Sequence, residues 1–174
     1  MQRIIFLVII LGLGWGCAQK VRTTFDKKAD FASYQTFCWL QGCEFTFTGP
    51  PYLKDQISIS SIKETIIQEM KRKGYVLDSS NPDFLIDFHI TVENKQSIVR
   101  RYDENYVELY APLPDDELYY YMEGTIIIDI VDKKSGRMVW RSHVHSHLEN
   151  KPNIPVDHAE NSVVQALKDF PPEN

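Results

Sequence analysis

The sequence predicts an α+β domain that folds as a two-layer sandwich. The predicted sheet is roughly four-stranded and mainly antiparallel, with two helices on one face and the element order β-α-β-β-β-α. Three observations predict this class: a length of 174 residues, which leaves room for one domain; two segments with apolar residues at helical spacing; and several segments that alternate as strands do. Stacking the helices on the apolar face of the sheet leaves the least apolar surface in water.

The first 16 residues have the layout of a secretory signal. A short basic start precedes the apolar run Ile4–Leu13, and Gly14, the bulky Trp15 and Gly16 lead to Cys17. Ten apolar residues are too few to span a bilayer as a helix. Residues 1–16 are therefore predicted to be a lipoprotein signal peptide, with the thiol of Cys17 acylated after cleavage. Two alternatives are ordinary cleavage after Ala18, which leaves no lipid, and a short anchor that is never cleaved.

Cys17 predicts where the domain works. Several acyl chains on one residue hold a protein at a membrane without a transmembrane helix. Ala18 stands where some lipoproteins carry an aspartate that keeps them at the inner membrane. The sequence therefore predicts an outer-membrane anchor with the domain facing the periplasm. Residues 17–30 are predicted to be lipid anchor and tether, and residues 31–174 to be the folded domain.

The charge of the chain is acidic. The net charge is -5, and removal of residues 1–16, which hold Arg3 and no acid, makes it -6 (18 basic and 24 acidic residues). Such a domain has no electrostatic reason to bind nucleic acid or an anionic lipid surface. The expected partners are the membrane, through the N-terminal lipid, and an envelope protein.

Two further cysteines, Cys38 and Cys43, form an even pair for an oxidising compartment. They are a candidate disulfide that would close a short loop. The alternative is that Cys38 is a small buried residue on a strand and Cys43 an idle thiol. A lone C-x4-C supplies only two metal ligands and lacks the second pair of a structural zinc site.

The first half of the domain contains one predicted strand and one predicted helix. The strand is Tyr34–Leu40, which is rich in aromatic and β-branched residues, and a loop over 41–55 follows it. Ser61 with Glu64 has the form of a capping box, and a helix start one turn earlier is the alternative. Gly74 is a natural residue just after a helix end. The apolar positions at helical spacing are Ile59, Ile62, Ile66 and Met70.

Three more strands are predicted in the second half. Apolar and mostly polar residues alternate over 84–93, which indicates a strand with one buried face. Residues 94–118 are predicted to be a long loop or an irregular edge strand. Tyr119–Asp132 and Arg137–Leu148 are predicted to pair as a hairpin around the turn at 133–136.

The hairpin and the segment after it complete the predicted fold. Keeping the two apolar faces of the hairpin together places Asp129 and Arg141 opposite or diagonal on the other face. Such a pair, if exposed, contributes only about 0–1 kcal/mol. Asp157 with Glu160 resembles a second capping box, and it opens an apolar-striped helix that stops at Pro171.

Several stretches resemble one family. Asp30–Leu40 resembles the opening strand of the DUF4136 (domain of unknown function 4136) lipoproteins, and Gly124–Asp132 with Ser135–Arg141 resembles their most distinctive stretch. Shorter similar stretches are Lys73–Tyr75, Asn81–Phe84 and Phe170–Pro172. Arg141–Ser142 departs from the small residue usual after the tryptophan. The likeness covers about residues 25–172. It implies an envelope lipoprotein with an α+β domain, but no known reaction and no established site.

His143, His145 and His147 are the sharpest candidate site. Alternate residues of a strand share a face, and neighbours on that face lie about 6.6–6.8 Å apart, which lets two imidazoles converge on one ion. Zinc, copper or nickel would suit such a pair, with His89 or Asp129 as an added ligand. The alternative is an exposed polar strand face on which the histidines bind nothing. No other cofactor is indicated.

The remaining patterns favour binding over catalysis. Tyrosines at 102, 106, 110 and 119–121 suggest a stacking platform for a glycan or a peptide, or else packing on the sheet. No nucleophile with a neighbouring base is marked by sequence, and no carboxylates are marked as a pair. The leading interpretation is a non-catalytic cell-envelope lipoprotein that binds a partner or supports an assembly. The alternatives are a metal-binding lipoprotein and a periplasmic hydrolase.

Overall fold

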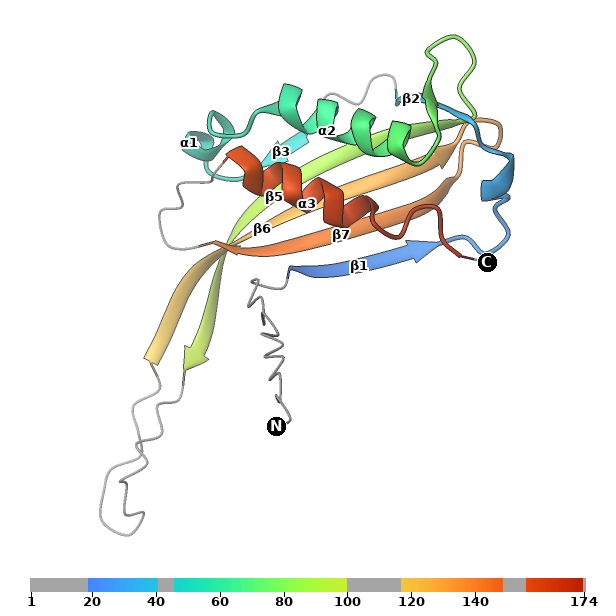
Figure 1. Ribbon diagram of the computed structural model, residues 1–174. Coiled ribbons are helices and arrows are strands. Elements are labelled where there is room, and N and C mark those ends of the chain that lie inside the picture. The colour runs from blue at the N-terminus through green and yellow to red at the C-terminus, as the bar shows by residue number, and fades with distance from the viewer. Residues whose placement is uncertain (1–18, 41–45, 100–116, 149–155, 174) are drawn as a thin grey trace, which may run out of the picture.

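The computed structural model describes residues 19–40, 46–99, 117–148 and 156–173 (Figure 1). These residues form one mixed sheet with a layer of helices on one face. The strands are β1 Lys20–Phe25, β2 Thr36–Trp39, β3 Thr46–Thr48, β4 Val76–Leu77, β5 Phe84–Val99, β6 Glu117–Asp132 and β7 Met138–Leu148. The helices are a 3-10 turn at Phe31–Ser33, α1 Pro51–Lys54, α2 Ile59–Arg72 and α3 Val156–Leu167.

The predicted four-stranded sheet with the order β-α-β-β-β-α is wrong. The sheet is seven-stranded and mixed, with the order β1-β7-β6-β5-β2-β4 and β3 paired to β5. The strands β1, β7, β6 and β5 are antiparallel neighbours, whereas β2 and β3 run parallel to β5, and β4 runs parallel to β2. The described residues also contain a third α-helix, α1.

The strands that sequence reasoning missed are short or lie at the edge of the sheet. β1 falls inside the segment 17–30 that the sequence predicts as anchor and tether, so Lys20–Phe25 of this segment belongs to the folded sheet. β1 lies at the edge of the sheet, where most of its side chains are exposed to solvent. An exposed edge strand has a mostly polar sequence, so it does not stand out as a strand. β3 and β4 have three and two residues, which is too few for a period of two to be recognised.

The two long helices lie side by side on one face of the sheet (Figure 1). The backbone N–H of Ser61 donates to the Ser58 side chain, so α2 begins one turn earlier than the Ser61–Glu64 pattern suggests. The Ser61 hydroxyl instead donates to Glu160 of α3. The two polar residues that resembled separate caps therefore link the helices to each other.

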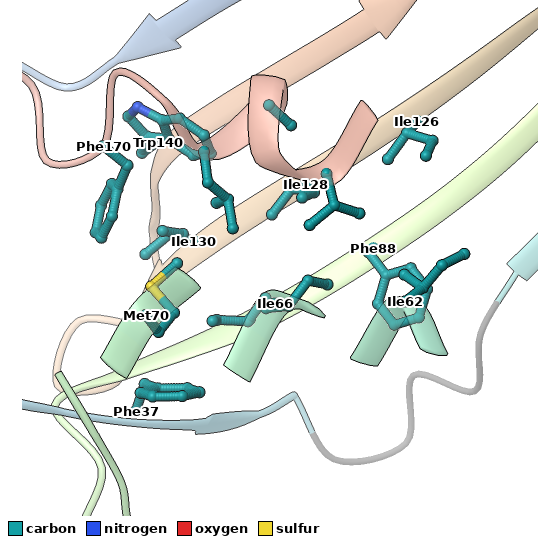
Figure 2. Close-up of a cluster of buried hydrophobic side chains, with 14 of the residues drawn as sticks. Phe37, Ile62, Ile66, Met70, Phe88, Ile126, Ile128, Ile130, Trp140 and Phe170 are labelled. Carbon is teal, nitrogen blue, oxygen red and sulfur yellow. The ribbon is translucent and has the colours of Figure 1, made fainter. Parts of the chain in front are cut away.

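The apolar core fills the space between the helices and the sheet (Figure 2). Ile66 and Met70 of α2 are fully buried against Ile128 and Ile130 of β6. Phe170, just after α3, packs among aromatic rings with centroids 5.3–6.0 Å away, which belong to Trp140, Tyr75, Phe84 and Phe31. This ring cluster joins the C-terminal end of the domain to the sheet.

The hairpin of β5 and β6 is longer than the rest of the sheet. Each strand has 16 residues, paired from Phe84 with Asp132 to Val99 with Glu117. Residues 94–118 were predicted to be a long loop or an irregular edge strand, and all of the part that the structure describes, 94–99 and 117–118, is strand. β7 ends opposite Met122, so residues 95–99 and 117–121 continue beyond it. We call these ten residues the arm; Figure 1 shows it leaving the sheet at the end where β1 begins and bending away from the helices.

Candidate functional site

The helices leave one face of the sheet uncovered within the described chain (Figure 1). We call it the outer face. From Trp140 to Leu148 of β7, buried residues alternate with more exposed ones. Val144 is 1% exposed and points toward the helices, whereas His143 and His145 are half-buried and His147 is exposed. The three histidines thus share one face of β7, as predicted, because alternate residues of a strand point the same way. The register of Ile126 with Val144 joins the apolar sides of β6 and β7, so the histidines lie on the side away from the helices.

Stacked rings occupy the part of the outer face nearest the arm. The ring centroids of Tyr121 and His147 are 4.6 Å apart, and those of Tyr119 and Tyr121 are 5.9 Å apart. Tyr119 also lies parallel to His147, with centroids 6.1 Å apart. Offset stacking at these distances is favourable. Of the predicted tyrosine platform, Tyr119 and Tyr121 lie here, and Tyr120 lies on the other side of β6.

An open hollow of about 310 Å³ lies beside the stacked rings and is lined by Lys20, Glu123, His145 and His147. Three strands, β1, β6 and β7, supply these side chains. Glu123 Oε1 is 3.6 Å from His145 Nδ1 and 3.9 Å from the ammonium of Lys95. Within the described chain the ammonium of the Lys20 side chain has no hydrogen bond or ion pair, so it can donate to a ligand.

Two ion pairs lie further along the outer face. Arg141 donates twice to the Asp129 carboxylate, Nε to Oδ1 and Nη2 to Oδ2, each at 2.6 Å. This confirms the predicted cross-strand pair, and the Asp129 hydrogen bond raises the pKa of Arg141. His89 Nε2 lies 3.0 Å from the Asp87 carboxylate. Burial, together with the neighbouring charges of Arg141 and His145, lowers the pKa of His143 and so favours its neutral form.

The outer face does not gather three metal ligands in the part of the chain that the structure describes. The rings of His143 and His145 lie parallel, with centroids 6.2 Å apart. The two predicted extra ligands are engaged elsewhere, Asp129 with Arg141 and His89 with Asp87. A zinc ion at the histidines would therefore have to take its further ligands from outside the described residues or from water.

Among the described residues, the polar groups at the hollow do not have the arrangement of a nucleophile and its base. The Thr125 hydroxyl lies 3.1 Å from His145 Nδ1, and the Glu123 carboxylate faces the same ring nitrogen. A catalytic relay needs the acid and the nucleophile on opposite nitrogens of the imidazole. The geometry therefore suits hydrogen bonding to a ligand better than activation of a hydroxyl.

The cysteines are placed only in part. Cys38 is half-buried on β2, opposite Leu85, and lines a second hollow of about 240 Å³ together with Pro82 and Lys133. Cys43 and Cys17 lie outside the described residues. The disulfide between Cys38 and Cys43 and the lipid on Cys17 both stay predictions.

Sequence reasoning missed Lys20 and Glu123 as members of the candidate site. Glu123 has the same parity as Asp129 on β6, so the alternation already places both on the outer face. Nothing in the sequence indicates that β1 is a strand or that it lies beside β7. The register that brings Lys20 opposite His145 is a tertiary result.

This architecture defines the class of protein: an α+β domain with helices on one face of a mixed sheet and, on the other, a polar and aromatic face that the described residues leave uncovered. The chain belongs to the family described as "Domain of unknown function (DUF4136)", whose model matches residues 21–172. No curated protein matches the sequence of the chain. Among the described residues, no helix is long and apolar enough to cross a membrane.

The solved structures that resemble this chain have low sequence identity to it. A PDZ domain protein from Parabacteroides distasonis is 18% identical, with a TM-score of 0.56 over 88% of this chain and 36% of its own length. This chain thus spans about a third of that protein. Two PelC dodecamer structures from Paraburkholderia phytofirmans are 12% and 10% identical, each with a TM-score of 0.46 over 86% of this chain, and 95% and 96% of theirs.

Proposed function

We propose that this chain is a cell-envelope lipoprotein, acylated at Cys17, whose domain is a non-catalytic binding module. The sequence of residues 1–17 supports the anchor. The hollow beside the stacked rings of the outer face supports the binding role and is the single observation that carries it.

The chemistry of the hollow suits a hydroxyl-rich chain such as a glycan. Its polar groups differ in kind: the Glu123 carboxylate accepts hydrogen bonds, the Lys20 ammonium donates them, and the imidazoles do either according to tautomer. The neighbouring rings of Tyr121 and His147 offer flat apolar surfaces. A few convergent polar groups beside aromatic surface is the usual composition of a ligand site.

Calorimetric titration tests the binding role. The mature protein in detergent is titrated with soluble peptidoglycan fragments, and saturable heat is expected. Tyr121→Ala and Glu123→Gln should each weaken binding about tenfold or more, as expected from the loss of about 1.4 kcal/mol or more. Tyr120→Ala is the matched control, because Tyr120 is the next residue of β6 but faces the other side of the strand.

Two results would count against this function. Equal weakening by the Tyr121 and Tyr120 variants would show that the outer face is not the binding surface. Absence of heat with every fragment would remove the glycan as ligand. Mass spectrometry tests the anchor separately: an unmodified mature chain that begins after Ala18 would refute acylation of Cys17.

A further inference from the structure

The arm carries apolar side chains that the described part of the chain does not cover. Its side that continues the helix-covered face of the sheet presents Ile98, Leu118 and Tyr120, which are 61%, 51% and 54% exposed. Ile98 pairs with Leu118, and Gln96 with Tyr120, so the three form one patch. Neither α2 nor α3 extends over it (Figure 1). We call Ile98, Leu118 and Tyr120 the arm patch.

The first described residue is held at the same end of the sheet. The Gln19 side-chain amide donates to Ser146 Oγ at 3.0 Å and to Ser162 Oγ at 2.8 Å. Cys17 precedes Gln19 by two residues, so the two can lie no more than about 7 Å apart. A lipid on Cys17 therefore keeps this end of the sheet close to the membrane surface.

The arm reaches further than the anchor. Lys20 pairs with His145, and His145 pairs with Thr125. Thr125 in turn pairs with Thr91 of β5, so Lys20 and Thr91 lie at the same position along the direction of the strands. Val99 lies eight residues beyond Thr91, or about 26 Å at strand spacing. Cys17 lies three residues before Lys20, or at most about 11 Å. With the strands directed at the bilayer, the arm enters the headgroup region before the anchor is fully extended.

We infer that the arm patch rests in the headgroup region of the membrane that holds the lipid, and that it sets the orientation of the domain. This rests on the proposed acylation of Cys17. Tyrosine is enriched at membrane interfaces because its ring is apolar and its hydroxyl is polar. Ile98 and Leu118 supply the shallow apolar contact that interfacial segments make.

The size of the arm patch favours lipid over a second copy of the chain. Its three side chains expose on the order of 300 Å², whereas a stable protein interface buries about 800 Å² on each partner. A lipid anchor supplies the affinity by itself, so the patch has only to choose an orientation. The mature chain is acidic, with 18 basic and 24 acidic residues and a net charge of -6, so it is not attracted to anionic lipid. The argument depends on apolar contact alone, and zwitterionic vesicles suffice.

Quenching by brominated lipid tests the inference. The mature, acylated protein is reconstituted into phosphatidylcholine vesicles that carry bromine on the upper part of the acyl chains. Two variants are compared, Tyr120→Trp in the arm and Met138→Trp at the opposite end of the sheet. Met138 is the matched control because it is 46% exposed and begins β7, far from the arm. The fluorescence of Trp39 and Trp140 is subtracted with the parent protein.

The expected result is loss of fluorescence and a blue shift in the Tyr120→Trp protein, with neither in the Met138→Trp protein. Equal fluorescence in brominated and ordinary vesicles overturns the inference, and a blue shift without quenching overturns it in favour of a protein cover. Mass spectrometry of the same sample separates the two proposals. An acylated Cys17 without quenching refutes only the arm contact, whereas an unmodified Cys17 refutes both.

Discussion

Replacing Arg141 with methionine tests how the outer face contributes to stability. As an exposed pair, Arg141 and Asp129 would contribute about 0–1 kcal/mol. The structure changes this expectation, because the Asp129 side chain is only 9% exposed while that of Arg141 is 38% exposed. Asp87 lies directly across from Asp129 in the register of β5 and β6, so losing the arginine would leave two carboxylates facing each other.

The expected loss follows from this partial burial. Breaking a fully buried pair by removing one partner costs about 3–5 kcal/mol, because an uncompensated charge remains. Arg141 is partly solvated and Asp129 keeps some access to water, so we expect Arg141→Met to lower the free energy of unfolding by about 2–3 kcal/mol. Adding Asp129→Leu should restore much of this loss, because the second substitution removes the unpaired charge.

Urea unfolding at neutral pH, followed by fluorescence, measures the change. Arg137→Met is the matched control, because the Arg137 side chain is 76% exposed and lies 4.0 Å from Asp26; it should cost less than about 0.5 kcal/mol. If Arg141→Met costs no more than Arg137→Met, the reasoning from burial is refuted. If the double variant is less stable than Arg141→Met, the unpaired carboxylate is not the cause of the loss.

Three further predictions concern other parts of the fold. Backbone N–H groups of Gln35 and Thr36 donate to Asp83 and hold its pKa low. Stability should therefore fall as the pH drops below about 4, the pKa of Asp83 in the unfolded chain, and through its lower pKa in the folded chain. Asp83→Asn should flatten this part of a plot of urea midpoint against pH. The lowered pKa of His143 means that stability falls as the pH drops below about 6.5, the pKa of histidine in the unfolded chain. His143→Gln should abolish this pH dependence of stability. NMR titration of the ring should show a midpoint below that of a free histidine. Gln19→Ala should cost about 1 kcal/mol and speed hydrogen exchange in β1; unchanged exchange would show that this side chain does not hold the strand.

Elements with strong local patterns were located well from the sequence. The apolar stripe of α2, the alternation of β5 and the turn between β6 and β7 each depend on residues close together in the chain. Their periods of 3.6 and 2 follow from backbone geometry alone. The facing of His143, His145 and His147 was predicted for the same reason, since parity on one strand settles it.

Elements without such patterns were missed. Val76 and Leu77 make a strand only because β2 lies beside them. β1 is polar enough to pass for a tether, and its pairing with β7 joins residues more than 100 positions apart. The segment after residue 93 lacks a continuous apolar face, so the continuation of β5 to Val99 depends on pairing with β6.

By itself the sequence determined the family, the apolar core segments and the face of β7 on which the histidines lie. Local periodicity carries that information, because each apolar face needs a partner. Only the tertiary structure decided the mixed seven-stranded sheet, the hollow that joins Lys20 to Glu123 and the length by which the arm exceeds the anchor. These features depend on the register between strands that are distant in the chain. The hydrogen bonds that set this register join backbone groups, so the sequence pattern of a single strand does not reveal them.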